Sequence, residues 1–455
     1  MKIPYQKPVI QKLKTGYLNK FGASPFYHRT VRTEIDQVPV DKLVEDFGSP
    51  LFVYSEDKFR QKIHSLRNNF AHYYPNVTLS WSYKTNYLKS ICAIAHQEGL
   101  GAEVVSEMEY DKARNLGVPG KDIIINGPHK PRSLIEKAAR EGAILHIDHF
   151  DEINDIEAVS DELEMTIPVA IRVNMETGIQ PQWSRFGFNL EAGQAIHAAK
   201  RIASGKKLRL IGLHAHIGTF ILEPNAYAQT VEKLVKLSYE VEDQLNFVIE
   251  YIDIGGGFPS RNKLKGTYLP PDLSIPPIED YAQAVSEAMF KNLRQGDTPK
   301  LILESGRFLI DEAGSLISTV FATKRLPDGR RGYVMDAGLN LLFTTFWYKF
   351  QIEMDREVQG MNEPSVLYGP LCMNIDVLED HVMLPALDRG TRLIFSPVGA
   401  YNNTQWMQFI EYRPNIVLIG KDGTVDLIRE REDLSDLERR ELLPQRLELN
   451  HEKTS

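Results

Sequence analysis

The sequence predicts an α/β protein organised around a (β/α)8 barrel, with a smaller domain of β-strands after it. Eight apolar runs typical of buried strands recur between residues 79 and 304, and segments with a helical apolar face separate them. Strands that alternate with helices in this way favour a closed parallel barrel. After about residue 311, short strands and tight turns predominate, as in antiparallel β-domains.

The elements follow in a regular order. Leu51–Tyr54 predicts a short strand, and Glu56–Tyr73 predicts a helix. The segments 88–99 and 131–142 place their apolar residues on one helical face, as surface helices do. The eight barrel runs begin near Leu79, Gly101, Asp122, Ala143, Ile167, Arg209, Phe247 and Lys300.

Four parts follow from this pattern. An N-terminal segment (1–50) is expected to join the β-domain, the barrel spans 51–310, the β-domain spans 311–430, and a charged tail spans 431–455. The charge run of the tail is typical of a solvated helix or a disordered segment. The stretch from Pro259 to Pro277 is expected to be a loop.

Composition excludes several classes of partner. The chain has 455 residues, 42% of them apolar, and its net charge of −8 disfavours nucleic acid and anionic membranes. Apolar runs stay well short of the roughly 20 residues of a membrane span, and the N-terminus lacks a signal-peptide core. The only cysteines, Cys92 and Cys372, lie far apart, so we expect no metal site. We predict a soluble, cytoplasmic protein.

Polar and small residues stand where the barrel runs end. Active sites of such barrels lie at the carboxyl ends of the strands, so we expect these side chains to meet at one mouth. They are Lys84, Glu103, Ser106, Asn126, Asp148, Arg172, Asn174, His216, Gly255 to Gly257, Glu304 and Arg307.

Lys84 ends the first run, LSWSYKTN. Burial there would disfavour the ammonium form and lower the pKa of Lys84, which prepares an amine for Schiff-base formation. From this stretch alone, an ordinary exposed lysine is the commoner alternative.

Two further groups indicate an anion site. Gly255–Gly257 follow the seventh run, where barrels often hold phosphate, although a tight turn is the alternative. Glu304 and Arg307 end the eighth run and either serve the same mouth or form a mutual salt bridge. We expect only one of His214 and His216 to face the interior, and we favour a structural role for a lone strand histidine.

Nine short motifs occur along the chain in a fixed order. They are SYKTN at Lys84, GAEVVSEMEY at Glu103, SRFGF at Arg185, HAHIGT at His216, DIGGGFP at Gly255, ESGR at Glu304, DAGLN at Asp336, GPLC at Cys372 and GAY at Tyr401. Together they resemble the alanine-racemase-type (fold-type III) pyridoxal-phosphate enzymes, within them the diaminopimelate/ornithine/arginine decarboxylases, and most closely the diaminopimelate decarboxylase branch. The resemblance spans about residues 45 to 425.

The resemblance implies a role for each matching residue. Lys84 would hold pyridoxal 5'-phosphate as a Schiff base, His216 would stack on the pyridine ring, and Glu304 would pair with the ring nitrogen. Cys372, from the partner subunit of a homodimer with shared sites, would act with Lys84 in catalysis. The phosphate and its surroundings would be held by Thr219, Gly255, Gly256, Gly257, Ser305, Gly306, Arg307 and Tyr401.

Two departures concern the amino-acid substrate, whose site would comprise Arg307, Thr344, Tyr348, Met373 and Tyr401. The related decarboxylases carry an arginine where this chain has Thr344 and an acidic residue where it has Met373. Losing both charged partners disfavours meso-diaminopimelate. We therefore predict an α-decarboxylase for a D-configured or conjugated amino acid.

Three alternatives stay open. The first is a true diaminopimelate decarboxylase. The second is an amino-acid racemase, which Glu304 disfavours because racemases of this fold place an arginine at the ring nitrogen. The third is a non-catalytic relative, against which the intact Lys84, glycine run, Glu304 and Cys372 count.

Overall fold

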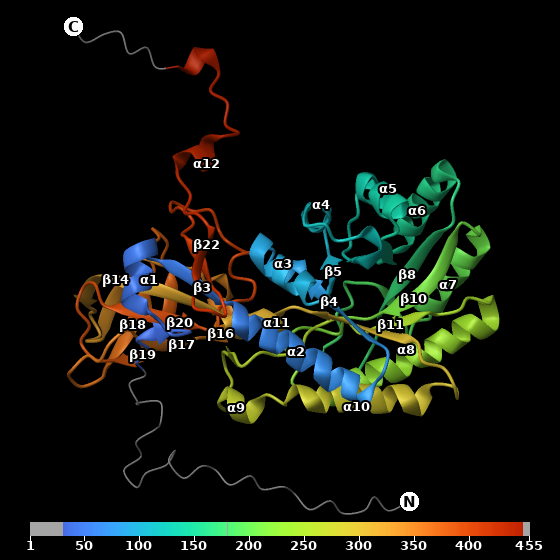
Figure 1. Cartoon of the computed structure of the whole chain (residues 1–455), viewed down its shortest axis with the longest axis horizontal. Helices are drawn as coiled ribbons and strands as arrows, with labels where there is room; N and C mark the ends of the chain where they lie inside the picture. The colour runs from blue at the N-terminus through green and yellow to red at the C-terminus, as the bar shows by residue number, and fades with distance from the viewer. Residues whose placement is uncertain (1–30, 180, 449–455) are drawn as a thin grey trace, which may run out of the picture.

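The computed structural model describes residues 31–179 and 181–448, which form a barrel and a second, largely antiparallel sheet. Figure 1 shows the barrel with its helices at one end of the molecule and the second sheet at the other. The predicted residues 1–30 of the N-terminal segment lie outside the described part.

The barrel is closed and its strands are parallel. β10 pairs with β11 on one side and with β8 on the other, which completes the ring, and a short β9 (Phe188–Asn189) pairs in parallel with the end of β8. This confirms the predicted fold class. The strands are β4 (Val77–Ser82), β5 (Gly101–Val104), β6 (Ile123–Ile125), β7 (Ile144–Ile147), β8 (Ile167–Asn174), β10 (Leu208–His214), β11 (Tyr251–Asp253) and β13 (Lys300–Ser305).

The surrounding helices follow the predicted periodicity. α2 buries Phe59, Ile63, Leu66 and Phe70 on one stripe, because residues three and four apart share a helical face. α5 ends at Gly142, whose left-handed backbone suits glycine. The helices of the barrel are α2 (Glu56–Tyr73), α3 (Lys89–Gln97), α4 (Glu107–Asn115), α5 (Arg132–Glu141), α6 (Phe150–Leu163), α7 (Gln194–Gly205), α8 (Pro224–Leu245) and α10 (Ile278–Asn292).

The second sheet takes in one strand that the sequence assigned to the barrel. β3 (Leu51–Ser55) lies between β14 and β21 and pairs with both, so the predicted boundary at residue 51 is wrong by one strand. A short apolar strand carries no signal for the sheet that it joins, because that pairing is non-local. The other strands are β14 (Gly314–Arg325), β15 (Arg331–Met335), β17 (Gln351–Met354), β18 (Glu363–Tyr368), β19 (Val377–Leu384), β20 (Arg392–Ser396), β21 (Ile416–Ile419) and β22 (Val425–Arg429).

The described part of the N-terminal segment packs on this second sheet. β1 (Glu34–Ile35) and β2 (Val38–Pro39) form a small hairpin that leads into α1 (Val40–Phe47). Their apolar side chains share one buried cluster with residues of β3, β14, β20 and β21. The segment therefore joins the β-domain from residue 31 onward.

The insertion after the seventh barrel strand is more ordered than predicted. β12 (Lys263–Leu264) pairs antiparallel with β16 (Tyr348–Lys349), and α9 spans Pro271–Ser274. The pairing joins the barrel mouth to the second domain and places Tyr348 at the mouth.

The tail leaves the body of the molecule. α12 (Leu434–Glu438) begins at the capping residue Asp433, and residues 441–448 are exposed (Figure 1). Among the described helices, none has both the length and the apolar character needed to cross a membrane.

Candidate functional site

A cavity of about 510 Å³ opens at the carboxyl ends of the barrel strands, and we call it the mouth cavity. A cavity of about 670 Å³ at the other end of the barrel contains none of the predicted residues. Ten predicted site residues line the mouth cavity, as the convergence of strand ends requires. They are Lys84, His216, Thr219, Gly257, Glu304, Gly306, Arg307, Thr344, Tyr348 and Tyr401.

Lys84 follows β4 in a short 3-10 turn (Tyr83–Thr85), and its Nζ donates to the carboxylate of Glu103 at 2.6 Å. Burial is the largest single influence and alone would lower the pKa of Lys84, but the charge and hydrogen bond of Glu103, together with Tyr401 and Glu304, outweigh it and raise the pKa. The predicted lowering is therefore wrong, because Glu103 arrives from the neighbouring strand. The alternative of an ordinary exposed lysine is also wrong, because Lys84 lines the cavity.

Glu304 lies at the base of the mouth cavity and is almost fully buried. Its Oε1 accepts a hydrogen bond from Asn126 Nδ2 at 2.6 Å, while its Oε2 lies 3.3 Å from Nε2 of His214. Burial and the negative charge of Glu304 raise the pKa of Asp253 well above its usual range, so Asp253 is the protonated member of this pair. Glu304 thus presents a buried carboxylate at the base of the cavity, with its Oε2 beside His214.

Arg307 lies between two tyrosine rings. Its guanidinium carbon is 4.5 Å from the ring centre of Tyr348 and 4.8 Å from that of Tyr401. It pairs with Asp311 at 3.6 Å rather than with Glu304, so the predicted alternative of a mutual Glu304–Arg307 salt bridge is not what forms. Its Nε and Nη1 have no hydrogen-bond partner in the described chain, and such donors suit an anion.

The glycine run lets three strand ends pack closely beside Arg307. A Cβ on Gly256 would lie 2.3 Å from the carbonyl oxygen of Glu304, and one on Gly257 would lie 2.4 Å from that of Gly218. A Cβ on Gly306 would lie 2.0 Å from Thr85 Oγ1. Close backbone approach therefore explains these glycines, and Gly257 also lines the cavity, as an anion cradle would.

Both histidines of the sixth run line the mouth cavity, so the expectation that only one faces inward is wrong. Residues two apart on a strand point to the same side of the sheet, and this spacing could have placed them together. Burial lowers the pKa of His214 and of His216 well below the usual range, so both rings are neutral. Trp183 stacks on His216 with ring centres 5.6 Å apart.

The outer part of the cavity is aromatic, and we call it the aromatic wall: Trp183, Phe186, Phe220, Trp347 and Tyr348. Thr344 beside it is buried, and its hydroxyl donates to Asn402 Oδ1 at 2.9 Å. The sequence identified only Tyr348 among these aromatics, because loops after different strands bring the other four together.

Five predicted site residues do not line the cavity of this chain. Gly255, Gly256 and Ser305 lie directly behind it in the strand ends, where Gly255 packs against His216. Cys372 is exposed and Met373 is half-buried, both in the connection between β18 and β19.

From the sequence, some further residues of the site were named only as strand ends, and others were not named. Glu103, Asn126 and Arg172 ended predicted strands and do line the cavity. His146 and Tyr251 lie behind it in a buried hydrogen-bond network. Polar residues inside apolar strands, as in AILHID and EYIDIGGG, are the signal that could have found the last two.

The side chains present fit pyridoxal 5'-phosphate. An amine at Lys84, the buried carboxylate of Glu304 and the Nε and Nη1 donors of Arg307, which have no hydrogen-bond partner in the described chain, match its aldehyde, ring nitrogen and phosphate. His216, which is neutral and presented to the cavity, suits an aromatic ring.

Comparison with known proteins also indicates a pyridoxal-phosphate site. The family described as pyridoxal-dependent decarboxylase, pyridoxal binding domain, matches residues 57–311. Diaminopimelate decarboxylase from Methanocaldococcus jannaschii is 28% identical over 430 residues, which cover 91% of this chain and 95% of that protein. The enzyme of the same name from Bacillus subtilis is 28% identical over 436 residues, covering 90% and 97%.

Solved structures share the whole architecture. The crystal structure of diaminopimelate decarboxylase from M. jannaschii has a TM-score of 0.84 at 28% identity and covers 92% of this chain and 99% of its own. A lysine/ornithine decarboxylase from Vibrio vulnificus has a TM-score of 0.72 at 24% identity, covering 85% and 98%, and shows a shared fold.

Proposed function

Because this chain belongs to the pyridoxal-dependent decarboxylases and is a pyridoxal-phosphate carboxy-lyase of the diaminopimelate decarboxylase type, we propose that it removes the α-carboxyl group of an amino acid other than meso-diaminopimelate. One observation carries the proposal. Every lysine or arginine that lines the mouth cavity in the described residues already has an acidic partner: Lys84 has Glu103, Arg172 has Asp148 at 3.9 Å, and Arg307, which is assigned to the cofactor phosphate, has Asp311. A second substrate carboxylate would find no unpaired cation there.

Each residue has a stated task in this proposal. Lys84 would bond the cofactor covalently, Arg307 with Thr219, Tyr401 and the glycine run would hold its phosphate, and His216 would contact its ring. When bound, the cofactor supplies an electron sink for the electrons that the departing carboxyl group leaves. The carboxylate of Glu304 would hold the proton on the ring nitrogen. The same carboxylate disfavours the racemase alternative, and the intact constellation disfavours a non-catalytic protein.

The aromatic wall supports a substrate whose distal part is apolar, aromatic or conjugated. Aromatic faces bind apolar surface and stack on planar groups, whereas a zwitterionic distal end needs charged partners. Thr344 and Met373 stand where such partners would be, and Thr344 already uses its hydroxyl on Asn402. A D-configured amino acid or a conjugate of an amino acid fits these surroundings best.

Steady-state kinetics on a panel of D- and L-diamino acids, their conjugates and meso-diaminopimelate, read out as carbon dioxide, tests the proposal. We expect kcat/KM for meso-diaminopimelate well below about 10⁴ M⁻¹s⁻¹, the lower range of dedicated enzymes. Thr344→Arg with Met373→Glu should raise that value by about tenfold, since each restores a charge-assisted bond. Thr344→Val with Met373→Leu is the uncharged control and should not. A wild-type kcat/KM for meso-diaminopimelate above about 10⁴ M⁻¹s⁻¹ would identify a true diaminopimelate decarboxylase.

We also propose that the enzyme is a homodimer whose sites are shared. Cys372 is exposed and lies outside the mouth cavity of its own chain, as a residue supplied to a partner would. Mixing inactive Lys84→Ala with inactive Cys372→Ala should restore up to about a quarter of wild-type activity, because half of the dimers then hold one intact site. Failure to complement, once subunit exchange is verified, would argue for sites built within one chain.

A further inference from the structure

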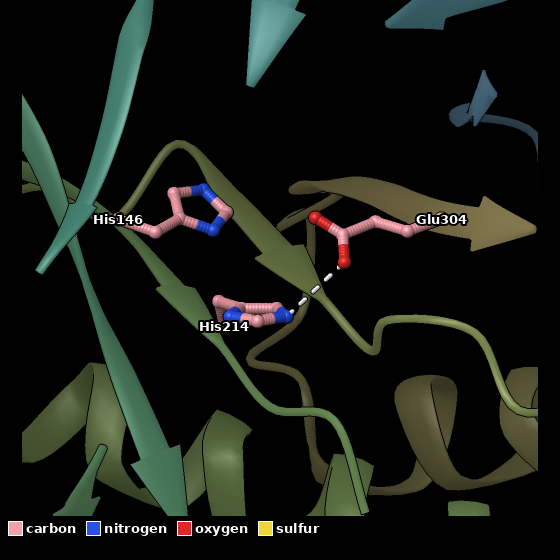
Figure 2. A group of neighbouring side chains, drawn as sticks. All are labelled: His146, His214 and Glu304. Carbon is pink, nitrogen blue, oxygen red and sulfur yellow. Dashed lines mark ion pairs between the residues drawn. The ribbon is translucent and has the colours of Figure 1, made fainter. Parts of the chain in front are cut away.

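His146 lies on β7 behind Glu304, and its ring is buried. Figure 2 shows His146, His214 and Glu304 pointing toward one another. His146 Nδ1 lies 2.9 Å from Asn126 Oδ1, and its Nε2 lies 2.9 Å from the hydroxyl of Tyr251 on β11. Both ring nitrogens are therefore engaged.

The proton positions in this network follow from what each group can donate. The amide nitrogen of Asn126 donates to Glu103 Oε1 at 3.0 Å and to Glu304 Oε1 at 2.6 Å, where the carboxylate oxygens accept. The NH₂ group of Asn126 must face them, so its Oδ1 faces His146. His146 Nδ1 must then donate, which leaves Nε2 as the acceptor of the Tyr251 hydroxyl.

Burial and the nearby His214 lower the pKa of His146 well below the usual range, which agrees with a neutral ring carrying a single proton. The backbone makes room for this arrangement at Gly212. A Cβ there would lie 2.1 Å from Cζ of the Tyr251 ring, so any larger residue would displace the hydroxyl from His146.

The same three side chains His146, His214 and Glu304 place possible metal-ligand atoms within 4.8 Å of one another. A metal ion would need an unprotonated nitrogen of His146 that has no other partner. The hydrogen bonds to Asn126 and Tyr251 occupy both nitrogens, so the cluster favours a proton network over a metal centre.

We propose that Tyr251 and His146 are positioning residues for the decarboxylase, which fix the orientation of the Asn126 amide and, through it, the carboxylate of Glu304 that faces the cofactor ring. Asn126 also bonds Glu103, so the same amide aligns the partner of Lys84. The inference rests on the proposed role of Glu304.

Without the Tyr251 hydroxyl, His146 is free to carry its proton on Nε2 instead. Its Nδ1 then repels Asn126 Oδ1, and an amide that turns over presents oxygen to two carboxylates. Tyr251→Phe should weaken cofactor binding to the apoprotein by about tenfold, the effect of one lost buried hydrogen bond. It should lower kcat to a similar extent.

Tyr333→Phe is the matched control, because Tyr333 is equally buried and donates to the Pro385 carbonyl in the second sheet. It should lower the melting temperature as much as Tyr251→Phe does and leave cofactor affinity unchanged. In an Asn126→Ala background, Tyr251→Phe should change cofactor affinity less than twofold, because the amide through which it acts is gone.

Histidine-selective ¹⁵N spectra of the apoprotein test the network without the cofactor. One signal, assigned by its loss in His146→Gln, should show the neutral Nδ1–H tautomer and become a mixture of tautomers in Tyr251→Phe. A neutral Nε2–H tautomer in the wild-type protein would overturn the proposal, as would full additivity with Asn126→Ala. So would stoichiometric Zn²⁺ binding that His146→Gln abolishes. None of these results depends on turnover, whereas near-normal turnover of Glu304→Gln would overturn the role of Glu304 alone.

Discussion

The inner and outer parts of the mouth cavity differ in chemistry. The inner part carries Lys84 paired with Glu103 of the adjacent strand, Glu304 bonded by Asn126 after β6, and Arg307 paired with Asp311 one helical turn further on. The outer part is the aromatic wall, and its described residues add no unpaired charge. Cofactor chemistry constrains the inner part, because it needs an amine, a carboxylate and an anion site at fixed positions. The outer part meets only the substrate, so it can change while the reaction class stays the same.

The largest expected effect is the loss of Lys84 from the inner part. Lys84→Ala should lower turnover by on the order of 10⁴-fold, as removal of a covalent catalytic residue does. It should also abolish the fixation of the cofactor by borohydride, measured by mass spectrometry. Cofactor that is still fixed to the variant chain would place the covalent residue elsewhere.

Loss of the Glu304 charge should have the second-largest effect on turnover, because this charge acts on the cofactor without bonding it covalently. Glu304→Gln keeps the shape and the hydrogen bond to Asn126 but removes the charge, and kcat should fall by about 10²–10³-fold, as for other groups that stabilise developing charge. Cofactor content, measured by absorbance, should stay near one per chain. Near-normal turnover would contradict the electron-sink argument.

Changes in the aromatic wall should alter substrate choice more than the reaction. Trp183→Ala removes the ring that stacks on His216 and should raise KM for the best substrate by about tenfold while kcat changes little, the signature of lost uniform binding. Phe321→Ala, an exposed aromatic of the second sheet, is the control. An equal loss in kcat would mean that the two parts of the cavity are coupled.

The smallest effect concerns pH and cofactor uptake by the apoprotein. Glu103 raises the pKa of Lys84, and only the unprotonated amine reacts, so uptake should accelerate as the pH rises toward that raised pKa. Glu103→Gln removes this charge and should lower the pKa, so that uptake at pH 7.5 becomes several-fold faster, about tenfold per pKa unit. Stopped-flow absorbance measures the rate. Slower uptake in the variant would show that orientation by Glu103 outweighs its charge.

Part of the site was readable from local pattern. Lys84, Glu304 and Arg307 follow apolar strands, and a barrel brings strand ends to one mouth, so their convergence needed only the fold class. The pairing of His214 with His216 was also within reach, because a spacing of two fixes the face. The Tyr251–His146–Asn126 network was not, since three strands supply it and no spacing in the chain links them.

The sequence by itself determined the barrel, its helices, the reaction class and the inner residues, because period-two and period-3.6 patterns and the ordered motifs are local properties of the chain. Only the tertiary structure decided that β3 joins the second sheet, that β12 pairs with β16, and that the pKa of Lys84 is raised rather than lowered. Both strand pairings and the direction of the pKa shift depend on which group, distant in the sequence, lies next to the residue in space. Strand pairing and electrostatic environment are set by neighbours in space, and sequence order does not specify those neighbours.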